Sequence, residues 1–406
     1  MILKKKTMIF NRIFFHKLCS RRLKLKNRAN AVIIGGGVIG ASIAFFLSKA
    51  GVKDIVVIEK EELLGSASTG LCAGGIRQQF GTEINTKLCM ESVKIFENFK
   101  EITGEPIEFI QAGYLFVAAK EDTMNHFRKN AAMHKSLGLD VHILSPEQIK
   151  EKVPFANTED LAGGTFCQSD GFADPNEVTQ AFASAARKNG VEFYNKVEAV
   201  GIKLNGNKIS AVVTNQGEIE TPLVVNAAGA WAREIAKMVN VELPVLPYRR
   251  QIFITEPFKE IPDVIPMIVD FDCGVYMRKE SGGVLMGKAD PNEVPGINLH
   301  VDWDFMTTIV EHALNRIPVL EKANIMRGWA GLYEITPDHH AILGKVPQVE
   351  GFILANGFSG HGFMQAPAVG KIISEIILDK KTTIDVSELR YERFKEGKMI
   401  YEGQVF

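Results

Sequence analysis

The feature that most constrains the fold is a glycine-rich hexapeptide near the start of the chain, residues 35–40 (GGGVIG). It follows an apolar run at 31–34, which predicts a short buried strand, and it opens the stretch 38–50, which predicts a helix. A second apolar run at 54–59 predicts another strand. A strand, helix and strand of this length form a parallel crossover, so the chain is expected to belong to the α/β class.

The hexapeptide also fits the G-x-G-x-x-G pattern of dinucleotide-binding turns. Gly35 would make the tight turn, Gly37 would let the backbone approach a diphosphate, and Gly40 would pack the helix on the strand. Free N–H groups at the start of the helix favour anions. Glu59, at the end of the second strand, offers a carboxylate to ribose hydroxyls. Such turns also occur without a ligand, but this context favours a bound dinucleotide.

Three later segments suit a cofactor that extends beyond this turn. The loop at 65–69 carries Ser68 and Thr69, whose hydroxyls could contact a second phosphate. Residues 225–231 end a strand in small side chains, which permits close approach of a cofactor. The turn at 357–363 precedes a helix, and its backbone amides could stabilise the negative charge that a flavin gains on reduction.

Hydrophobic periodicity predicts the remaining elements. Helices are expected at 121–138, 146–152, 175–188 and 367–378. Strands are expected at 107–119, 191–197, 209–214, 223–226 and 351–355, with antiparallel strands between 243 and 288.

These motifs, in this order over residues 31–385, resemble the D-amino acid oxidase superfamily of FAD enzymes. Four segments are similar to the β subunits of heterotetrameric sarcosine oxidase and archaeal L-proline dehydrogenase: 75–80, 113–116, 329–331 and 357–363. The resemblance implies a Rossmann-like FAD-binding domain interleaved with an antiparallel-sheet substrate domain, which is α/β in class and α+β overall. It also implies hydride transfer to the flavin from a carbon next to nitrogen.

The resemblance assigns roles to individual residues. Those expected to contact FAD are Gly35, Gly37, Val38, Ile39, Gly40, Glu59, Lys60, Ser68, Thr69, Val197, Gly229, Gly357, Gly360, His361, Gly362 and Phe363. Those expected to face the substrate are Arg77, Tyr276, Tyr333 and His361. Arg77 matches an arginine that sarcosine oxidases use against the substrate carboxylate, and a charged fork of this kind orients its ligand.

Three of these residues have structural alternatives. Arg77 could instead bridge Glu83 or Glu91. His361 lies in a glycine-rich turn, which favours a packed, hydrogen-bonded histidine over an acid or base. Tyr276 is equally typical of sheet packing.

No metal site is expected, because the five cysteines form no C-x-x-C pair. His339 and His340 follow Asp338, but adjacent side chains diverge, which favours a loop role. Trp231 and Trp329 are expected in the core.

This sequence differs from the families that it resembles at positions that attach the flavin or assist reaction with oxygen. Monomeric sarcosine oxidase carries its flavin on a cysteine, and Gly331 stands at the matching place, so FAD is expected to be non-covalent. Pro175 stands where the heterotetrameric enzyme attaches FMN to a histidine, so any FMN at a subunit interface would also be non-covalent. The lysines that assist reaction with oxygen are missing, since Met364 replaces one and Lys288 is displaced from the other. A dehydrogenase that passes electrons to an α subunit or another acceptor protein is therefore favoured.

The expected organisation interleaves two domains. The FAD-binding domain comprises 30–104, 155–235 and 330–385, and the substrate-binding domain comprises 105–154 and 236–329. A basic leader, 1–29, and a C-terminal tail, 386–406, flank them. The leader is either a mitochondrial presequence or an overlong gene start. A signal peptide or membrane anchor over 31–47 is disfavoured by its glycines and short length.

The leading hypothesis is FAD-dependent oxidation of the C–N bond of a small secondary or N-methyl amino acid such as sarcosine or L-proline. The alternatives are a glycine or D-amino acid oxidase and a non-catalytic flavoprotein assembly factor of the respiratory chain. The formal net charge of -1 gives no reason to expect nucleic acid as a partner, and no transmembrane segment is expected. The expected location is the cytoplasm, or the mitochondrion if the leader is a presequence.

Overall fold

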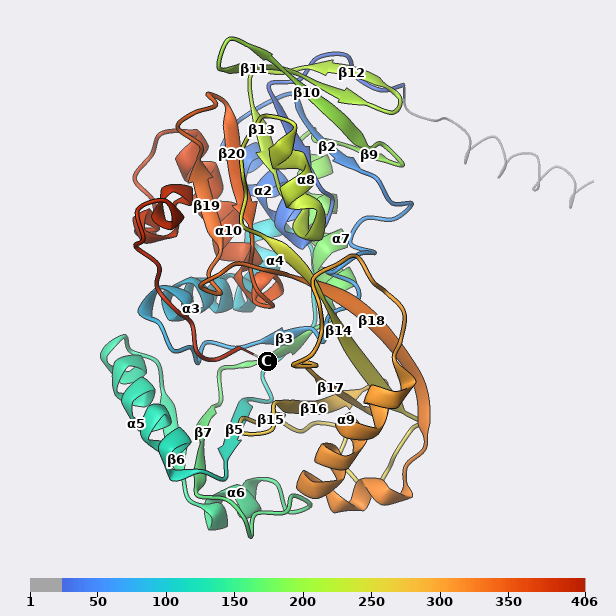
Figure 1. The fold of residues 1–406 in the computed structure, drawn as a ribbon, viewed down its shortest axis with the longest axis vertical. Helices are drawn as coiled ribbons and strands as arrows, with labels where there is room; N and C mark the ends of the chain where they lie inside the picture. Colours follow the sequence, from blue (N-terminus) through green and yellow to red (C-terminus); the bar gives the residue numbers. More distant parts are fainter. Residues whose placement is uncertain (1–23, 406) are drawn as a thin grey trace, which may run out of the picture.

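The computed structural model describes residues 24–405 (Figure 1). The expected leader lies mostly outside this range, and its described end is packed on the fold. Lys26 Nζ pairs with Asp54 at 2.7 Å and with Glu192 at 3.1 Å, and Ala29 is buried. The folded structure therefore begins before residue 30.

The first large sheet has six strands in the order β19-β20-β13-β1-β2-β9. Its strands are β1 (Ala31–Ile34), β2 (Ile55–Glu59), β9 (Glu192–Asn195), β13 (Val224–Asn226), β19 (Ile342–Lys345) and β20 (Phe352–Asn356). All neighbours are parallel except β19, which runs antiparallel to β20 at the edge. β1 is buried at every position, as a central strand between two layers requires.

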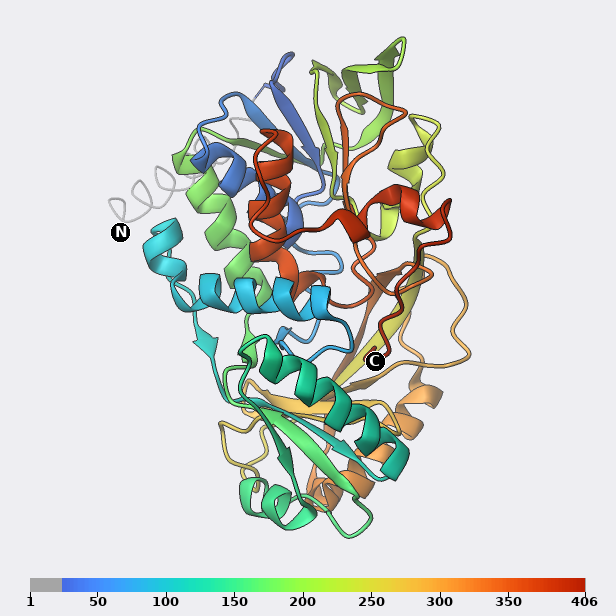
Figure 2. The same ribbon diagram turned by 90° about the vertical axis from the view of Figure 1, so that its left-hand side faces the viewer.

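Helices cover one face of this sheet, with α2 (Val38–Lys49) between α7 (Pro175–Lys188) and α10 (Gly362–Ile377) (Figures 1 and 2). The contact between α10 and α2 is close, since a Cβ on Gly370 would lie 2.1 Å from Ser42 Oγ. Further helices α3 (Glu83–Glu97) and α4 (Phe99–Thr103) pack against α10 and α7. Together these helices and the sheet bury one continuous apolar core.

The opposite face carries a second apolar core. A three-stranded antiparallel sheet covers it, together with α8 (Ala232–Lys237). The strands of that sheet are β10 (Ala199–Asn205), β11 (Lys208–Thr214) and β12 (Gly217–Glu220). The six-stranded sheet is thus a middle layer, which explains why its central strands β1, β13 and β20 are buried at every position.

The second large sheet has eight strands in the order β18-β14-β17-β16-β15-β5-β7-β6 and fills the lower half of Figure 1. Its strands are β5 (Tyr114–Ala118), β6 (Val141–Leu144), β7 (Gly163–Cys167), β14 (Leu246–Thr255), β15 (Met267–Asp270), β16 (Val275–Glu280), β17 (Gly283–Lys288) and β18 (Ile325–Ile335). Only β15 and β5 are parallel neighbours. The flanking helices are α5 (Glu121–Ser136), α6 (Pro146–Lys152) and α9 (Trp303–Arg316).

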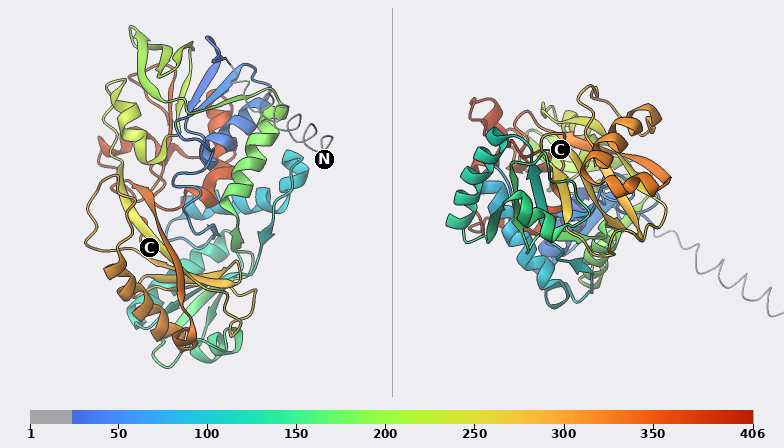
Figure 3. Two further views of the ribbon diagram at one scale, coloured as in Figure 1. Left: turned by 90° about the vertical axis from the view of Figure 1, so that its right-hand side faces the viewer. Right: turned by 90° about the horizontal axis from the view of Figure 1, so that it is seen from below.

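A small sheet stands where the two halves meet, with β8 (Gly171–Ala173) between β3 (Gly75–Ile76) and β4 (Phe109–Ile110). The long pair β14 and β18 also runs between the halves (Figure 3). Short 3₁₀ helices lie at Gly229–Trp231, Pro318–Lys322, Ser387–Leu389 and Tyr391–Phe394.

The expected fold class is confirmed, because a mainly parallel sheet with crossover helices is interleaved with a mainly antiparallel one. Two details differ from the expected division at 155 and 330. β7 pairs with β5 and β6, and β18 crosses residue 330 without interruption. Cross-strand pairing decides both, and it joins segments that are distant in sequence.

Several helices follow their sequence patterns. α5, α6 and α7 are found where periodicity predicts them. α10 begins at Gly362, before the expected start at 367, because Pro367 is accommodated inside the helix. α3 and α9 are absent from the predictions, although α3 buries Ile84, Leu88 and Ile95 along one face, a spacing that could have identified it.

The C-terminal segment 386–405 returns to the junction between the two sheets (Figures 1 and 2). Arg393 makes a buried ion pair with Asp338 at 2.8 Å. Further on, the buried Glu402 accepts hydrogen bonds from Gly81 N at 2.7 Å and Thr82 Oγ1 at 2.8 Å. The segment expected to be a tail is therefore an integral part of the fold.

Within residues 24–405 there is no helix with the length and apolar character needed to cross a bilayer.

Candidate functional site

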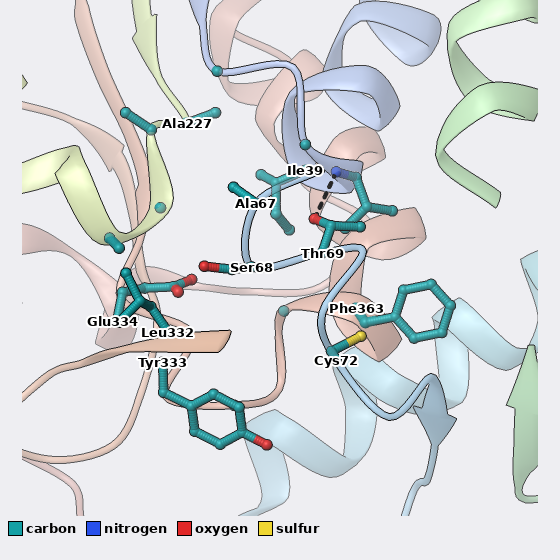
Figure 4. A pocket seen from close by; sticks show the side chains of 18 of the residues that line it. Ile39, Ala67, Ser68, Thr69, Cys72, Ala227, Leu332, Tyr333, Glu334 and Phe363 are labelled. Carbon is teal, nitrogen blue, oxygen red and sulfur yellow. Dashed lines mark hydrogen bonds between the residues drawn. The ribbon is translucent and has the colours of Figure 1, made fainter. Parts of the chain in front are cut away.

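A cavity lies at the carboxyl ends of β1, β2 and β13 and reaches one face of the eight-stranded sheet (Figure 4). The glycine turn, the end of β2, the loop 67–69, the segment 227–231, the turn 359–364 and residues 332–334 of β18 all contribute to its walls. In open α/β sheets, ligands bind outside the carboxyl ends of the strands. The position therefore supports the predicted dinucleotide site.

The glycine turn is shaped by two contacts that exclude any side chain. Gly35 has φ +112°, and a Cβ there would lie 2.3 Å from Ala227 O. A Cβ on Gly40 would lie 1.9 Å from Gly35 O. Gly40 does not line the cavity, contrary to its expected contact with FAD, and instead packs the start of α2 against the turn.

The start of α2 faces the cavity through Gly37, Val38 and Ile39. Gly37 is the N-cap and provides no side-chain hydrogen bond to the helix. Thr69 Oγ1 accepts a hydrogen bond from Val38 N at 3.2 Å, the dashed line in Figure 4, and the Ser68 hydroxyl points into the cavity. Backbone amides at a helix start and two hydroxyls form a site for phosphate groups.

Glu59 is held rigidly at the end of β2. One carboxylate oxygen accepts from Gly36 N and the other from Glu61 N, both at 2.8 Å. Its backbone oxygen accepts from Val197 N at 2.9 Å, which places Val197 against the same wall. The Glu59 carboxylate thus links the glycine turn to the end of β2.

Lys60 and Trp231 close another part of the wall. Lys60 Nζ lies 3.3 Å from the centre of a Trp231 ring, a cation–π contact. Trp231 lines the cavity and is half-buried, so its expected place in the core is wrong. The Trp231 ring lies at the surface of the cavity, where one of its faces contacts the Lys60 ammonium group.

The turn before α10 carries Gly360, Gly362 and Phe363 into the cavity. Gly360 has φ +93°, and a Cβ there would lie 2.3 Å from the Tyr333 ring. Gly357 does not line the cavity, contrary to its expected cofactor role. With φ +71° and Thr336 Cγ2 only 2.3 Å from a Cβ position, it shapes the turn from behind the wall.

The residues expected to face the substrate also line this cavity: Arg77, Tyr276, Tyr333 and His361. Both tyrosines lie on the eight-stranded sheet and are half-buried. Burial raises the pKa of each phenol, so both are neutral hydrogen-bond donors at pH 7. Tyr333 points away from the glycine turn in Figure 4.

Arg77 is buried and bonded to the main chain. It donates to Gln79 O and, at 2.6 Å, to Gln404 O in the C-terminal segment. The alternative bridge to Glu83 or Glu91 is not formed, because these acids pair with Lys87 and Lys371 instead.

His361 packs edge-on against Phe80, with the ring centroids 4.9 Å apart. Burial and then the charge of Arg77 lower the pKa of His361 well below its ordinary value. The imidazole is therefore neutral at pH 7, which favours the packed role over that of a proton donor.

The neighbouring histidines are parts of the loop after β18. His340 Nδ1 bonds to Asp338 O at 2.8 Å and its Nε2 to Thr82 Oγ1 at 2.9 Å. Within the range 24–405, no cluster of three or more His, Cys, Asp or Glu side chains could hold a metal ion.

The model of the family described as "FAD dependent oxidoreductase" matches residues 30–376. The chain belongs to this family. FAD is therefore the dinucleotide of the site, and the resemblance to the D-amino acid oxidase superfamily is confirmed.

Individual relatives place the chain within the family. It is 32% identical to rat (Rattus norvegicus) mitochondrial dimethylglycine dehydrogenase over 91% of its own length, but it spans only 45% of that protein. It is 31% identical to Xenopus laevis "FAD-dependent oxidoreductase domain-containing protein 1", covering 93% of this chain and 85% of the relative. Among solved structures, L-proline dehydrogenase from P. horikoshii superposes with a TM-score of 0.87 at 35% identity, covering 92% of this chain and 99% of that one.

The residues of the cavity fit FAD. Gly229 has φ +51°, and no atom lies within 4 Å of its Cβ position, so the wall stays open where a side chain would intrude. The uncapped start of α2 suits the diphosphate, and Glu59 suits the ribose. Gly331 has no side chain that could form a covalent bond to the flavin.

Glu334 is a site residue that the sequence analysis missed. Its carboxylate faces the cavity near Ser68 (Figure 4), and burial raises its pKa to about 7. Its position on β18 beside Tyr333 carries no motif, so only the packing of β18 along the cavity reveals it.

We expect Glu334 to make FAD binding dependent on pH. The carboxyl is neutral below pH 7 and ionised above it, and the ionised form repels the anionic diphosphate. The Kd for FAD should rise by up to about tenfold between pH 6 and pH 8. Glu334→Gln should flatten this dependence in fluorescence titrations, whereas the exposed Glu218→Gln should not. Equal slopes in Glu334→Gln and the unaltered protein would contradict the assignment.

Proposed function

We propose that this chain is the FAD-bearing part of a dehydrogenase that oxidises the C–N bond of a small amino acid with a secondary or N-methylated amine, such as sarcosine, dimethylglycine or L-proline. The supporting observation is that Tyr276, Tyr333 and His361 line the same cavity as the FAD-binding turn. The names of the relatives agree with this substrate class, and the dehydrogenase from P. horikoshii matches along 99% of its length.

When bound, FAD supplies the acceptor for the hydride that leaves the carbon next to nitrogen. A secondary amine would also lose its N–H proton and give an imine, whereas a tertiary amine such as dimethylglycine would give an iminium ion, and water would hydrolyse either product. The chain itself must hold that carbon in place and keep water away from it. Neutral Tyr276, Tyr333 and His361 suit this task because they add no charge beside a neutral amine.

The electron acceptor is proposed to be another protein rather than oxygen. Lys288, the cation nearest to the position used by oxidases, donates instead to Cys273 O. Its cross-strand partner is Gln251, on the face of the sheet opposite Tyr276. Met364 lines the cavity where the other lysine is missing. An α subunit is the proposed partner, and any FMN at their interface would be non-covalent, since Pro175 offers no attachment point.

Anaerobic bleaching of the flavin spectrum tests the activity. Sarcosine, dimethylglycine, L-proline and glycine should be compared, and at least one secondary or N-methyl amino acid should bleach the flavin. Glycine bleaching alone, with peroxide release by the isolated chain, would support the glycine or D-amino acid oxidase alternative instead. Stopped-flow mixing of the reduced protein with air should show reoxidation much slower than turnover with an artificial acceptor.

A second candidate is a non-catalytic flavoprotein that assists assembly of the respiratory chain. In its favour, the chain spans 85% of the Xenopus relative, whose name gives no substrate, but less than half of dimethylglycine dehydrogenase. A mitochondrial location would suit this role and a basic leader, whereas the amino acid dehydrogenase also suits the cytoplasm. Failure of all the amines to bleach a fully FAD-loaded protein would favour this candidate.

A further inference from the structure

Two consecutive arginines on β14 differ in how their charges are compensated. Arg249 Nε pairs with Glu293 at 2.7 Å, and its Nη2 lies 3.8 Å from Asp302. Arg250 forms no ion pair with any acidic side chain in the described part of the chain. Its Nη1 donates to Arg249 O at 2.9 Å, and among residues 24–405 its buried Nε meets no acceptor. A half-buried guanidinium with a donor left over is suited to an anionic ligand.

Arg250 is not among the residues that line the cavity, but it lies on the same face of the sheet as Tyr333, which does line it. It stands opposite Gly331, and Tyr248 stands opposite Tyr333, in the antiparallel pair β14 and β18. Paired residues share a face of a sheet, as do residues two apart on one strand. Arg250 and Tyr333 are therefore on the same side.

Tyr276 reaches toward this arginine from the other direction. Its strand pairs it with Gly287, which in turn stands opposite Ile252 of β14. A Cβ on Gly287 would lie 2.3 Å from the Tyr276 hydroxyl, so the ring extends across the glycine toward β14. Because residue 287 has no side chain, the Tyr276 ring can lie over β17, on the face of the sheet that carries Arg250.

The arrangement of Arg250, Tyr276 and Tyr333 suits an anionic ligand. The Arg250 guanidinium carbon lies 5.2 Å from the centre of the Tyr333 ring. Neither the Tyr276 nor the Tyr333 hydroxyl has a hydrogen-bond partner within residues 24–405, and both rings line the cavity. The charge of Arg250 opposes the rise in pKa that burial causes in both phenols, which shows that it acts on both. One guanidinium and two phenols offer several donors.

We propose that Arg250, assisted by the hydroxyls of Tyr276 and Tyr333, binds the carboxylate of the amino acid substrate, and that Arg77 is a positioning residue. This proposal rests on the proposed function. The Arg77 fork donates to Gln79 O and Gln404 O and so ties the wall of the cavity to the C-terminal segment. Arg250 Nη2 makes no hydrogen bond within residues 24–405, so it is the donor that a ligand would use.

The consequence is a requirement for a carboxylate in the substrate. A guanidinium fork binds a carboxylate with two parallel hydrogen bonds, and a lysine offers a point charge without that geometry. Arg250→Lys should therefore restore only part of what Arg250→Gln loses. Amines without a carboxylate, such as pyrrolidine and dimethylamine, should be poor ligands of the unaltered protein.

The test uses the full-length FAD-loaded protein and pyrrole-2-carboxylate, a carboxylate that cannot be oxidised in the same way. Binding is followed by the perturbation of the flavin absorbance, and pyrrole serves as the uncharged probe. Arg250→Gln should raise the Kd for pyrrole-2-carboxylate by about 10- to 100-fold. The exposed Arg327→Gln on β18 is the control and should leave the Kd unchanged. FAD content and the melting temperature show whether each variant is folded.

The outcomes separate this proposal from the proposed function. Unchanged Kd values in Arg250→Gln, or no binding of the carboxylate by the unaltered protein, would overturn the role of Arg250. If Arg250→Gln does not fold, an unchanged Kd in Arg250→Lys would have the same meaning. Binding that depends on Arg250 without oxidation of any amino acid would instead overturn the proposed activity and leave the anion site in place.

Discussion

Replacing Gly40 by alanine should yield a protein that no longer retains FAD. The new Cβ would lie 1.9 Å from Gly35 O, a backbone atom, so either the start of α2 or the turn itself must move. Overpacking of this kind costs on the order of 1–3 kcal/mol or more. The same distortion displaces the amides that face the diphosphate, so the Kd for FAD should rise by about 100-fold or more.

The measurement is FAD content after purification, followed by titration of FAD into the apoprotein. Gly296→Ala is the matched control, because no atom lies within 4 Å of its Cβ position and its φ is not in the left-handed region. It should bind FAD normally. A Gly40→Ala protein that is purified with a full complement of FAD would show that the turn is not the diphosphate site.

Replacing Arg393 by methionine should cause the largest loss of stability. Its guanidinium pairs with Asp338 at 2.8 Å, with both side chains almost fully buried, and it also donates to His340 O. Removing one partner of a buried pair leaves the other charge without compensation, at a cost of roughly 3–5 kcal/mol. Thermal and urea unfolding, followed by circular dichroism, would measure the change.

Arg390→Met provides the control, because Arg390 pairs with Glu396 at the surface, where such pairs contribute about 0–1 kcal/mol. Equal destabilisation by the two substitutions would contradict the role of the buried pair. A dependence on pH adds a second test. Burial alone would raise the pKa of Asp338, but the hydrogen bonds from Arg393 lower it below its ordinary value. The stabilisation is therefore present at neutral pH and is lost in acid as Asp338 becomes protonated.

Much of the FAD-binding part of the site could be predicted from local sequence. The glycine spacing, the two apolar strands and Glu59 specify a dinucleotide turn, because each of these features acts within one short crossover. Gly229 and Gly360 were found through small residues at the ends of strands and before a helix. Gly357 was wrongly assigned to the cofactor site. A glycine-rich turn shows that the backbone bends tightly, but it does not show which of its glycines face the cavity.

The residues that the sequence analysis missed were all missed for one reason. Glu334, Arg250 and the Gln404 carbonyl belong to no motif. Glu334 lines the cavity, whereas Arg250 contacts Tyr333 and Gln404 contacts Arg77, in both cases through packing of distant segments. Arg250 gains its place from pairing between β14 and β18, which are about 80 residues apart in the chain. No local pattern encodes which residue will lie opposite another in such a pair.

The sequence by itself determined the class of fold, the family and the FAD-binding turn, because strand and helix periods and glycine geometry are properties of neighbouring residues. Only the tertiary structure decided that Glu334 faces the cavity, that Arg250 lies beside Tyr333, and that the C-terminal segment holds Arg77. The physical reason is that burial and cross-strand register set both the position and the ionisation of those groups, and both arise only when distant segments pack together.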